Sequence, residues 1–321
     1  MPRKIMRCFV VAALLLSAMP AIRAADYPTR PLTLVVAFTP GGASDVLSRI
    51  LARKLKQILG QPIVIDNRPG AGGNVAAEAV AHAAPDGYTL FTGNNAILAT
   101  NAALYKKINF DPVADFAPIG LIGSQANILV VNPALPVRSM DELIALAKAN
   151  PGKLNFASSG HGLAAHLAGE LFKAEAKIDI VHVPYKGAAP ALQDVIAGHV
   201  QMMFATASSV VPHIQDGKLR ALAVATLKRT AIFPTIDELG IKNFDATTWH
   251  GLVTRAGTSP DVVATLNRAL VATLEDPAVR KSLGDLGVDI IAGTPEEFAA
   301  YIKSEIPKWT AIIKASGAKL D

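Results

Sequence analysis

The sequence predicts an α/β fold made of two lobes, and three observations support this prediction. Apolar runs typical of buried strands alternate with segments at helical spacing, which favours mostly parallel sheets flanked by helices. The alternation forms two blocks, and the segments after the last predicted strand, Thr248–Thr254, are helical only. Because helices without strands must pack on an existing sheet, we expect the chain to cross twice between the lobes. Two crossings would form a hinge with a cleft beside it.

The N-terminal segment, residues 1–24, is predicted to be a cleaved secretory signal peptide. It begins with the basic stretch MPRKIMR, continues with the apolar stretch CFVVAALLLSAM and ends in small residues, with cleavage expected after Ala24. The apolar stretch is too short for a membrane helix, and a buried N-terminal helix is the alternative. The single cysteine, Cys8, lies in this segment, so the mature chain has no disulfide and no thiolate metal site.

The net charge gives no reason to expect nucleic-acid binding. The whole chain carries +5, but the signal peptide holds four basic residues and no acidic one, which leaves about +1 on the mature chain. No run of lysine and arginine with interleaved aromatic residues follows.

The first block contains three predicted strands and two predicted helices. Apolar residues at three- and four-residue spacing mark the helices, and Gly60 ends the first of them. In chain order we expect a strand at Leu32–Phe38, a helix at Val46–Leu59, a strand at Pro62–Ile65, a helix at Val75–Ala83 and a strand at Tyr88–Thr92.

The second block begins with a long apolar stretch, Ile119–Val131, interrupted by Gly123-Ser124. Ser139 is expected to cap the helix that follows, and Gly198 to end a later one. In chain order we expect a helix at Asp141–Lys148, a strand at Lys153–Ala157, a helix at Leu163–Phe172, a strand at Ile178–Val183, a helix at Pro190–Ala197 and strands at Val200–Ala205 and Leu219–Thr226.

The last part of the chain is predicted to return to the first sheet. Lobe 1 would comprise residues 25–125 and 250–321, and lobe 2 residues 126–249, with crossings near Ile122–Val131 and Trp249–Thr254. We expect a strand at Thr248–Thr254, then helices at Pro260–Leu274, Pro277–Leu283 and Pro295–Ala315, and no further strand.

The turn Pro40-Gly41-Gly42 joins a predicted strand directly to a predicted helix. It lacks the lysine of a phosphate-binding P-loop, and Gly70-Ala71-Gly72 lacks the third glycine of a dinucleotide-binding loop. The first turn of a helix has unpaired N–H groups and a partial positive charge, which Gly41 and Gly42 would let a carboxylate approach. A tight turn without a ligand is the alternative. Asp45, in the same turn, is either structural or receives a cationic or hydroxyl part of a ligand.

Small polar residues follow the ends of four further predicted strands. Ligands of open parallel sheets bind at the carboxyl ends of the strands, so these ends together predict a cleft lined by neutral donors. Such a cleft suits a small polar molecule or a carboxylate. The stretches are Thr92–Asn95, Ser158–Gly162, Tyr185–Gly187 and Thr206–Ser209.

Five motifs, taken together and in order, resemble the Bug/TctC family of extracytoplasmic solute receptors of tripartite tricarboxylate transporters. The resemblance covers essentially the whole mature chain. The motifs are P-G-G-A-S-D-V-L-S-R (Pro40–Arg49), N-R-P-G-A-G-G-N (Asn67–Asn74), P-D-G-Y-T-L (Pro85–Leu90), Y-K-G-A-A-P-A-L (Tyr185–Leu192) and W-H-G-L (Trp249–Leu252).

The resemblance implies a type II periplasmic-binding-protein fold that closes on a small ligand, commonly a carboxylate, through backbone N–H groups and bridging waters. The sequence departs from many relatives at His161, where they have a small residue. His161 is expected to pair with a second carboxylate or to fill space. The residues and the resemblance together give these candidate ligand-binding residues: Phe38, Gly41, Gly42, Asp45, Asn94, Ser158, Ser159, Gly160, His161, Tyr185, Lys186, Gly187, Ala205, Thr206 and Ser208.

The implied function is that of a periplasmic receptor. Such a receptor would capture a small carboxylate by hinge closure and deliver it to the membrane permease subunits of a tripartite tricarboxylate transporter. We expect a monomer that needs no cofactor and no metal.

A secreted hydrolase that uses Ser158 or Ser159 is the alternative function. The G-x-S-x-G pattern of a nucleophile elbow is absent, and the histidines show no metal-binding spacing. His161 and His166, five residues apart, are expected to diverge on a helix. We therefore expect no enzymatic activity.

Overall fold

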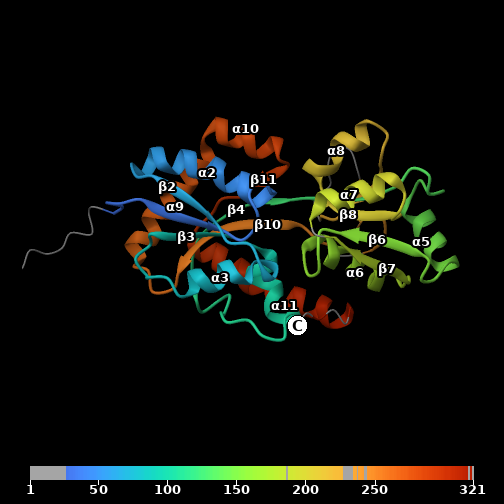
Figure 1. Cartoon of the computed structure of the whole chain (residues 1–321), viewed down its shortest axis with the longest axis horizontal. Coiled ribbons are helices and arrows are strands. Elements are labelled where there is room, and N and C mark those ends of the chain that lie inside the picture. The colour runs from blue at the N-terminus through green and yellow to red at the C-terminus, as the bar shows by residue number, and fades with distance from the viewer. Residues whose placement is uncertain are drawn as a thin grey trace, which may run out of the picture.

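The computed structural model describes residues 27–185, 187–226, 234–236, 238–241, 244–316 and 319, so the predicted signal peptide lies outside it. Figure 1 shows two α/β lobes side by side, joined by extended strands. Within the described ranges, no helix has the length and apolar character needed to cross a membrane.

The first lobe is built on a six-stranded sheet with the order β11-β4-β10-β3-β1-β2. β1 pairs in parallel with β2 and β3, whereas β10 pairs antiparallel with β3 and β4, and β11 pairs antiparallel with β4. The strands are β1 (Leu32–Val36), β2 (Ile63–Asn67), β3 (Thr89–Asn94), β4 (Phe116–Gln125), β10 (Thr248–Arg255) and β11 (Val288–Ile290).

Helices cover both faces of this sheet (Figure 1). One face carries α2 (Ala43–Leu59), α9 (Pro260–Glu275) and α10 (Pro277–Asp285), whose leucines pack on Leu32 and Leu34 of β1. The next residue of β1, Val35, points to the other face, because successive side chains of a strand alternate. That face carries the short 3₁₀ helix η2 (Ala71–Gly73), the short π-helix η3 (Ala96–Thr100) and the helices α3 (Asn74–Ala81), α4 (Asn101–Leu104) and α11 (Pro295–Ser316).

The second lobe is built on a five-stranded sheet with the order β7-β6-β8-β5-β9. β6 pairs in parallel with β7 and β8, and β5 pairs antiparallel with β8 and β9. Ser139 caps its first helix, as predicted, by accepting the N–H of Glu142. The elements are β5 (Asn127–Val131), α5 (Met140–Ala149), β6 (Leu154–Ser158), α6 (Ala164–Ala176), β7 (Ile180–Pro184), α7 (Ala188–Ala197), β8 (Met202–Thr206), α8 (Ala207–Gln215) and β9 (Arg220–Val224).

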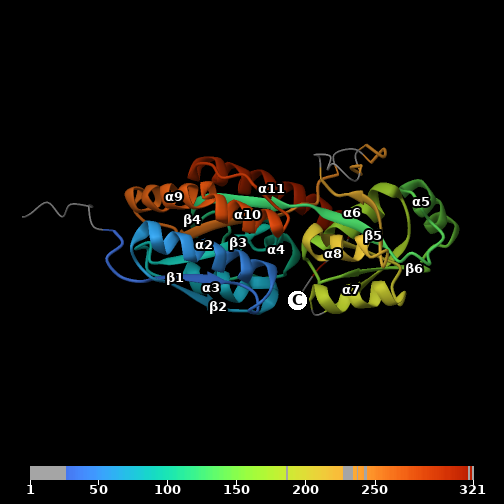
Figure 2. The ribbon, with the colours of Figure 1, turned by 90° about the horizontal axis from the view of Figure 1, so that it is seen from above.

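Both sheets are mixed, which corrects the expectation that each is mostly parallel. The reason is the route of the chain between the lobes. β4 leads the chain out of the first lobe and β10 leads it back, so these two neighbours run in opposite directions (Figure 1). The antiparallel pairs of β5 in the second lobe have the same origin, because β5 directly continues β4 (Figure 2).

The strand β11 and the helices η3, α4 and α8 were not predicted. The strand β11 has only three residues, too few to show a periodic pattern. η3 and α4 follow β3 without a glycine or proline to mark a boundary, in an apolar segment that is buried throughout η3. α8 contains Pro212, which argues against a helix when only the sequence is considered.

The two crossings lie side by side and are tied together by Asn127. The first passes through Ala126, between β4 and β5, and the second lies between Ala246 and Thr248. The buried Asn127 Nδ2 donates to the carbonyl oxygen of Ala246 at 2.6 Å and to Thr248 Oγ1 at 3.3 Å. Trp249, just after the second crossing, pairs with β4. The exact domain boundaries stay a prediction.

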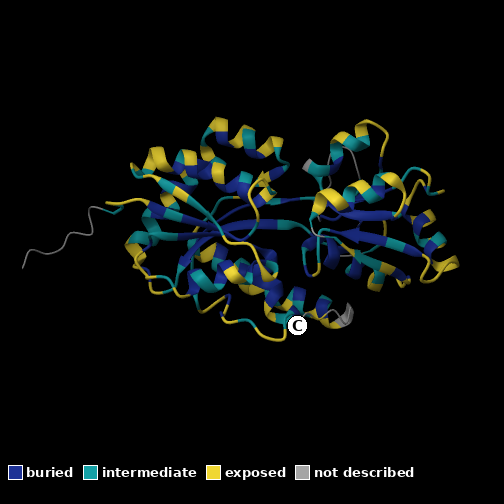
Figure 3. Cartoon of the chain, in the orientation of Figure 1, coloured by how far each residue is buried: buried dark blue, intermediate teal, exposed yellow. Residues whose placement is uncertain are grey.

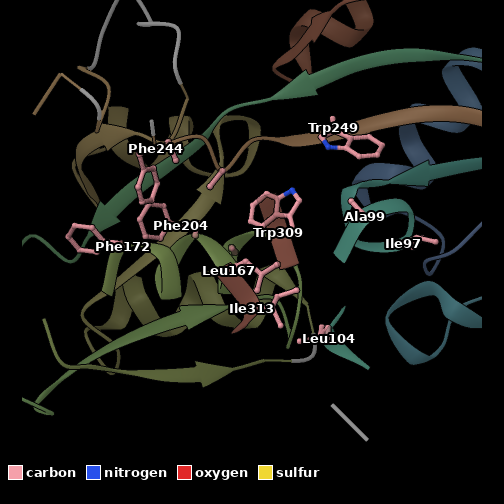
Figure 4. Packing of buried hydrophobic residues seen from close by; sticks show 14 of the residues in the cluster. Ile97, Ala99, Leu104, Leu167, Phe172, Phe204, Phe244, Trp249, Trp309 and Ile313 are labelled. Carbon is pink, nitrogen blue, oxygen red and sulfur yellow. The ribbon is translucent and has the colours of Figure 1, made fainter. Parts of the chain in front are cut away.

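One apolar cluster continues from the first lobe into the second. Figure 3 shows the buried residues concentrated in the sheets and on the inner faces of the helices. Figure 4 shows Trp309 and Ile313 of α11 beside Leu167 of α6, in the cluster that also contains Trp249 and Phe204. The C-terminal helix therefore packs against both lobes.

Candidate ligand-binding site

A cavity of about 420 Å³ is lined by residues of both lobes and of both crossings. This volume suits a small organic molecule. The lining residues from the first lobe and the crossings are Phe38, Thr39, Gly42, Ala43, Ser44, Asn94, Asn95, Ala96, Gln125, Asn127, Thr248 and His250. Those from the second lobe are Ser159, Leu163, Ala164, Ala165, Gly187, Ala188, Met203, Phe204, Ala205, Thr206 and Ser209.

Four helices begin at this cavity, and none of them has a side-chain cap. The residues that precede α2, α6, α7 and α8, which are Gly42, Leu163, Gly187 and Thr206, line the cavity and make no capping side-chain hydrogen bond. Of the helices that begin elsewhere, α5, α9 and α10 are capped by Ser139, Ser259 and Asp276, whereas α3 and α4 have no side-chain cap. The Ala207 N–H of α8 donates to the carbonyl oxygen of Ala126, and Pro190 in the first turn of α7 has no N–H. The other first-turn N–H groups of the four cavity helices are left for a ligand or water.

The described lining residues include no lysine, arginine, aspartate or glutamate. His250 is fully buried, and burial lowers its pKa to about 4, so it is neutral at pH 7. The positive potential of the cavity comes instead from the N-terminal ends of the helices, each equivalent to about half a unit charge. A site of this kind favours an anion without offering it a counter-ion.

Two buried polar atoms at the cavity have no hydrogen-bond partner within the described part of the chain. They are Nδ2 of Asn95 and Nδ1 of His250. Asn95 Nδ2 is a donor, whereas His250 Nδ1 is an acceptor, because the Nε2 of this neutral ring faces the amide oxygen Oε1 of Gln125 at 3.4 Å. A buried polar atom without a partner is costly, so Asn95 Nδ2 favours a ligand oxygen or an ordered water, and His250 Nδ1 favours a water or a hydroxyl group.

Asp45 is part of the turn and does not line the cavity. Its side chain is 2% exposed and accepts hydrogen bonds from the Gly41 N–H at 2.9 Å, from Arg49 Nε at 2.9 Å and from Asn67 Nδ2 at 3.0 Å. Gly41 has φ +83°, a conformation that favours glycine. Of the two roles considered for Asp45, these contacts favour the structural one. The Gly41 N–H is thereby occupied by the protein itself.

The Asp45→Asn substitution is expected to destabilise the fold by about 2 kcal/mol at pH 7. The hydrogen bond from Arg49, with those from Gly41 and Asn67, lowers the Asp45 pKa to about 2. Since the folded-state pKa lies below that of the unfolded chain, this stabilisation is present above about pH 4 and is lost as the pH falls towards 2. Urea denaturation at several pH values should therefore show a flatter acid dependence for the variant.

The control for this experiment is Asp66→Asn, which removes a surface ion pair with Arg68 and should change stability by less than about 1 kcal/mol. An equal loss of unfolding free energy in Asp45→Asn and Asp66→Asn would contradict the structural role given to Asp45.

A second cavity of about 430 Å³ adjoins the first, because the two share Phe38, Ser159 and Leu163. It is lined in addition by Gly72, Tyr105, Gly160 and His161. The two cavities together offer room for a ligand longer than one carboxylate group.

The structure brings most of the predicted site residues to these cavities. Those that line one or both are Phe38, Gly42, Asn94, Ser159, Gly160, His161, Gly187, Ala205 and Thr206. Those that line neither are Gly41, Asp45, Ser158 and Tyr185. Lys186 lies outside the described residues, and for Ser208 only the backbone, within α8, is described.

Two kinds of residue stand out among the lining residues that sequence reasoning missed. Ala43, Ala164 and Ala188 are the first residues of helices, where the backbone N–H is present whatever the side chain, so their residue type gives no signal. Gln125 and Asn127 flank Ala126 at the first crossing. Their two amide side chains, next to each other in the sequence, were the one signal that could have indicated this part of the site.

Ser158 contacts a histidine, as the nucleophile of a serine hydrolase would, but it lies where no substrate can reach it. Its Oγ lies 2.6 Å from His182 Nε2, while the residue is fully buried and lines neither cavity. The same hydroxyl donates to the Gly160 carbonyl at 3.0 Å. The hydrogen bond therefore fixes the loop after β6 and does not present a nucleophile to a substrate.

Comparison with known proteins identifies the family. The model of the tripartite tricarboxylate transporter family receptor, TctC, matches residues 47–318. BugT of Bordetella pertussis is 38% identical over 303 residues, which are 93% of each chain.

Two solved structures are similar over nearly their whole length. Rpa4515 of R. palustris with adipate has a TM-score of 0.84 and 37% identity, covering 92% of this chain and 100% of its own. MatC of Rhodopseudomonas palustris with bound malate has a TM-score of 0.80 and 33% identity, covering 89% of this chain and 100% of its own.

These similarities confirm the two-lobed periplasmic-binding-protein fold. The proteins of the family are periplasmic receptors, not enzymes, so the hydrolase alternative is not supported. The chain belongs to the tripartite tricarboxylate transporter receptor family, TctC.

Proposed function

We propose that this protein is a receptor that binds a small dicarboxylate in the cavity between its lobes. The observation that carries the proposal is the convergence of four uncapped helix N-termini on a cavity whose described lining holds no charged side chain. Carboxylate oxygens accept several N–H hydrogen bonds at once, which satisfies such a site.

A dicarboxylate is favoured over a monocarboxylate by two observations. The adjoining cavities share part of their lining, which gives an elongated ligand room for a second polar end. The similar structures carry adipate and malate, each with two carboxylates. His161 lines the second cavity, where its imidazole can donate to the distal carboxylate.

Binding is proposed to proceed by hinge closure about the paired crossings. The uncapped turn of α2 belongs to the first lobe and those of α6, α7 and α8 to the second, so one ligand takes hydrogen bonds from both. A ligand that contacts both lobes stabilises the closed arrangement and shifts the equilibrium towards it.

The receptor is proposed to act in the periplasm, after removal of residues 1–24, and to deliver its ligand to the permease subunits of a tripartite tricarboxylate transporter. The basic and apolar segments of the N-terminus and the family membership support this proposal. We propose a monomer, because a single chain supplies both walls of the cavity.

A thermal-shift screen of adipate, malate, succinate and glutarate tests the proposal. At least one of them is expected to raise the melting temperature. A ligand at a hundred times its Kd adds about 2.7 kcal/mol of stability, equivalent to about 5 °C for a chain of this size.

Adipamide, which has the length of adipate but no charge, is the matched control and should give no shift. The proposal would be contradicted if no carboxylate stabilised the protein, or if adipamide stabilised it as well as adipate.

A further inference from the structure

Three histidines, His161, His166 and His182, form a cluster beside the proposed ligand site. One ring nitrogen of each lies within 4.8 Å of a ring nitrogen of the other two. The expectation that His161 and His166 diverge was wrong, because α6 begins at Ala164 and His161 lies in the loop before it. β7 brings His182 against both, with ring centroids 5.2 Å from His161 and 3.9 Å from His166.

The hydrogen bonds of His182 leave one of its ring nitrogens available. When Ser158 Oγ donates to the Gly160 carbonyl and accepts from the Gly160 N–H, the 2.6 Å contact with His182 is assigned to Nε2–H as the donor. The lone pair of His182 then lies on Nδ1. A histidine held through its other ring nitrogen in this way is typical of metal ligands.

His166 has the same tautomer for a different reason. Its Nδ1 accepts the Gly162 N–H at 3.0 Å, and its Nε2 lies 3.9 Å from Glu170 Oε1. A metal ion at Nδ1 would replace one neutral hydrogen bond, which is weak compared with a metal–imidazole bond. Gly162, at φ +74°, belongs to the same loop as His161 and would move with it.

The protonation states also suit a metal. Burial, together with the neighbouring histidines, lowers the pKa of His166 to about 4 and that of His182 to about 3. Both rings are therefore neutral at pH 7, the form in which imidazole binds metals. His161 is exposed and lines the second cavity, so solvent can reach the cluster.

We propose that His161, His166 and His182 form a binding site for one divalent transition-metal ion, such as Zn²⁺, at the second-lobe side of the cleft. Three imidazole ligands suit Zn²⁺, Cu²⁺ and Ni²⁺ and leave a fourth position for water or another oxygen ligand. Zn–N bonds of about 2.1 Å require the three nitrogens to draw closer, and the loop holding His161 can move towards the other two rings. The rings of His166 and His182 are stacked with their planes inclined by 25°, so they must also turn for both Nδ1 lone pairs to point at one ion. The site does not depend on the proposed carboxylate ligand.

The test uses the full chain purified without a polyhistidine tag and freed of metal with EDTA. Titration with ZnCl₂ is followed by calorimetry, and titration with CoCl₂ by the visible absorption of cobalt bound to nitrogen. We expect saturable binding of one ion per chain. His161→Ala should weaken it by at least about a hundredfold, and Ser158→Ala, which releases His182, by about tenfold.

Two exposed histidines elsewhere, His82 and His199, provide matched controls, and their alanine variants should bind Zn²⁺ as the parent does. His161→Ala is the decisive variant, because it removes an exposed side chain, and a thermal melt verifies its fold. The proposal is overturned if no saturable site exists, if His161→Ala binds normally, or if His199→Ala abolishes binding instead.

Discussion

The Gly42→Val substitution is expected to weaken dicarboxylate binding at least about a hundredfold, equivalent to about 3 kcal/mol. Gly42 lines the cavity and directly precedes the uncapped first turn of α2. A valine side chain at this position would block the approach of a carboxylate to the N–H groups of Ala43 and Ser44, which also line the cavity.

The fold should tolerate this change. Gly42 has φ −74° and ψ 166°, an extended conformation that valine adopts readily. A Cβ atom there would meet only the carbonyl oxygen of Thr39, at 3.4 Å. The loss of affinity is therefore expected without a comparable loss of stability.

Calorimetric titration of the parent and the variant with the ligand found in the thermal-shift screen measures the effect. Gly284→Val is the matched control, since a Cβ at that position in α10 meets no atom within 4 Å and Gly284 does not line the cavity. Unchanged affinity in Gly42→Val would place the ligand elsewhere and contradict the proposed site.

The Glu305→Ala substitution is expected to destabilise the protein by about 3 to 5 kcal/mol. Glu305 lies in α11 and is 5% exposed. Its Oε2 accepts the indole N–H of Trp249 at 2.9 Å and that of Trp309 at 2.8 Å, and its Oε1 accepts from Lys308 at 3.0 Å. Removing the carboxylate leaves two buried N–H groups unsatisfied.

Glu305 lies where it connects elements that contact both lobes. Trp249 begins β10 just after the second crossing, and Trp309 packs in the cluster that reaches the second lobe (Figure 4). The carboxylate thus holds the returning strand against the C-terminal helix. Because the chain has only these two tryptophans, intrinsic fluorescence reports directly on the contact during urea denaturation.

Two control variants separate the hydrogen bonds from the general loss of a charge. Glu305→Gln keeps one acceptor oxygen and should lose less stability than Glu305→Ala. Glu296→Ala removes an exposed carboxylate from the first turn of the same helix and should cost less than about 1 kcal/mol. A loss in Glu305→Ala no larger than in Glu296→Ala would show that the indole contacts contribute little.

The periodic parts of the fold were predictable because each is decided by residues close together in sequence. The leucines of α2 recur at helical spacing, and Gly60 in the left-handed conformation ends that helix. Ser139 caps α5 through a neighbouring N–H. The directions of the strands were not predictable in the same way. The sheets are mixed because the chain leaves the first lobe along β4 and returns to it along the neighbouring β10.

The candidate site was predictable only in part, for a related reason. The glycines and small residues at strand ends revealed the loops of the second lobe, including Ser159 and Gly187, which line the cavity. The choice between a structural and a binding role for Asp45 depended on Arg49 and Asn67, four and twenty-two residues away. The histidine cluster was missed because β7 supplies His182 from a distant part of the chain.

By itself, the sequence determined the alternation of strands and helices, the two blocks and the family, because local periodicity, turn residues and motifs are properties of neighbouring residues. Only the tertiary structure decided which helix N-termini meet at one cavity, how the crossings are tied by Asn127, and which histidines lie together. These arrangements depend on contacts between residues far apart in the chain. Every residue type except proline has a backbone N–H group, so the N–H groups that meet at the cavity cannot be recognised from residue types.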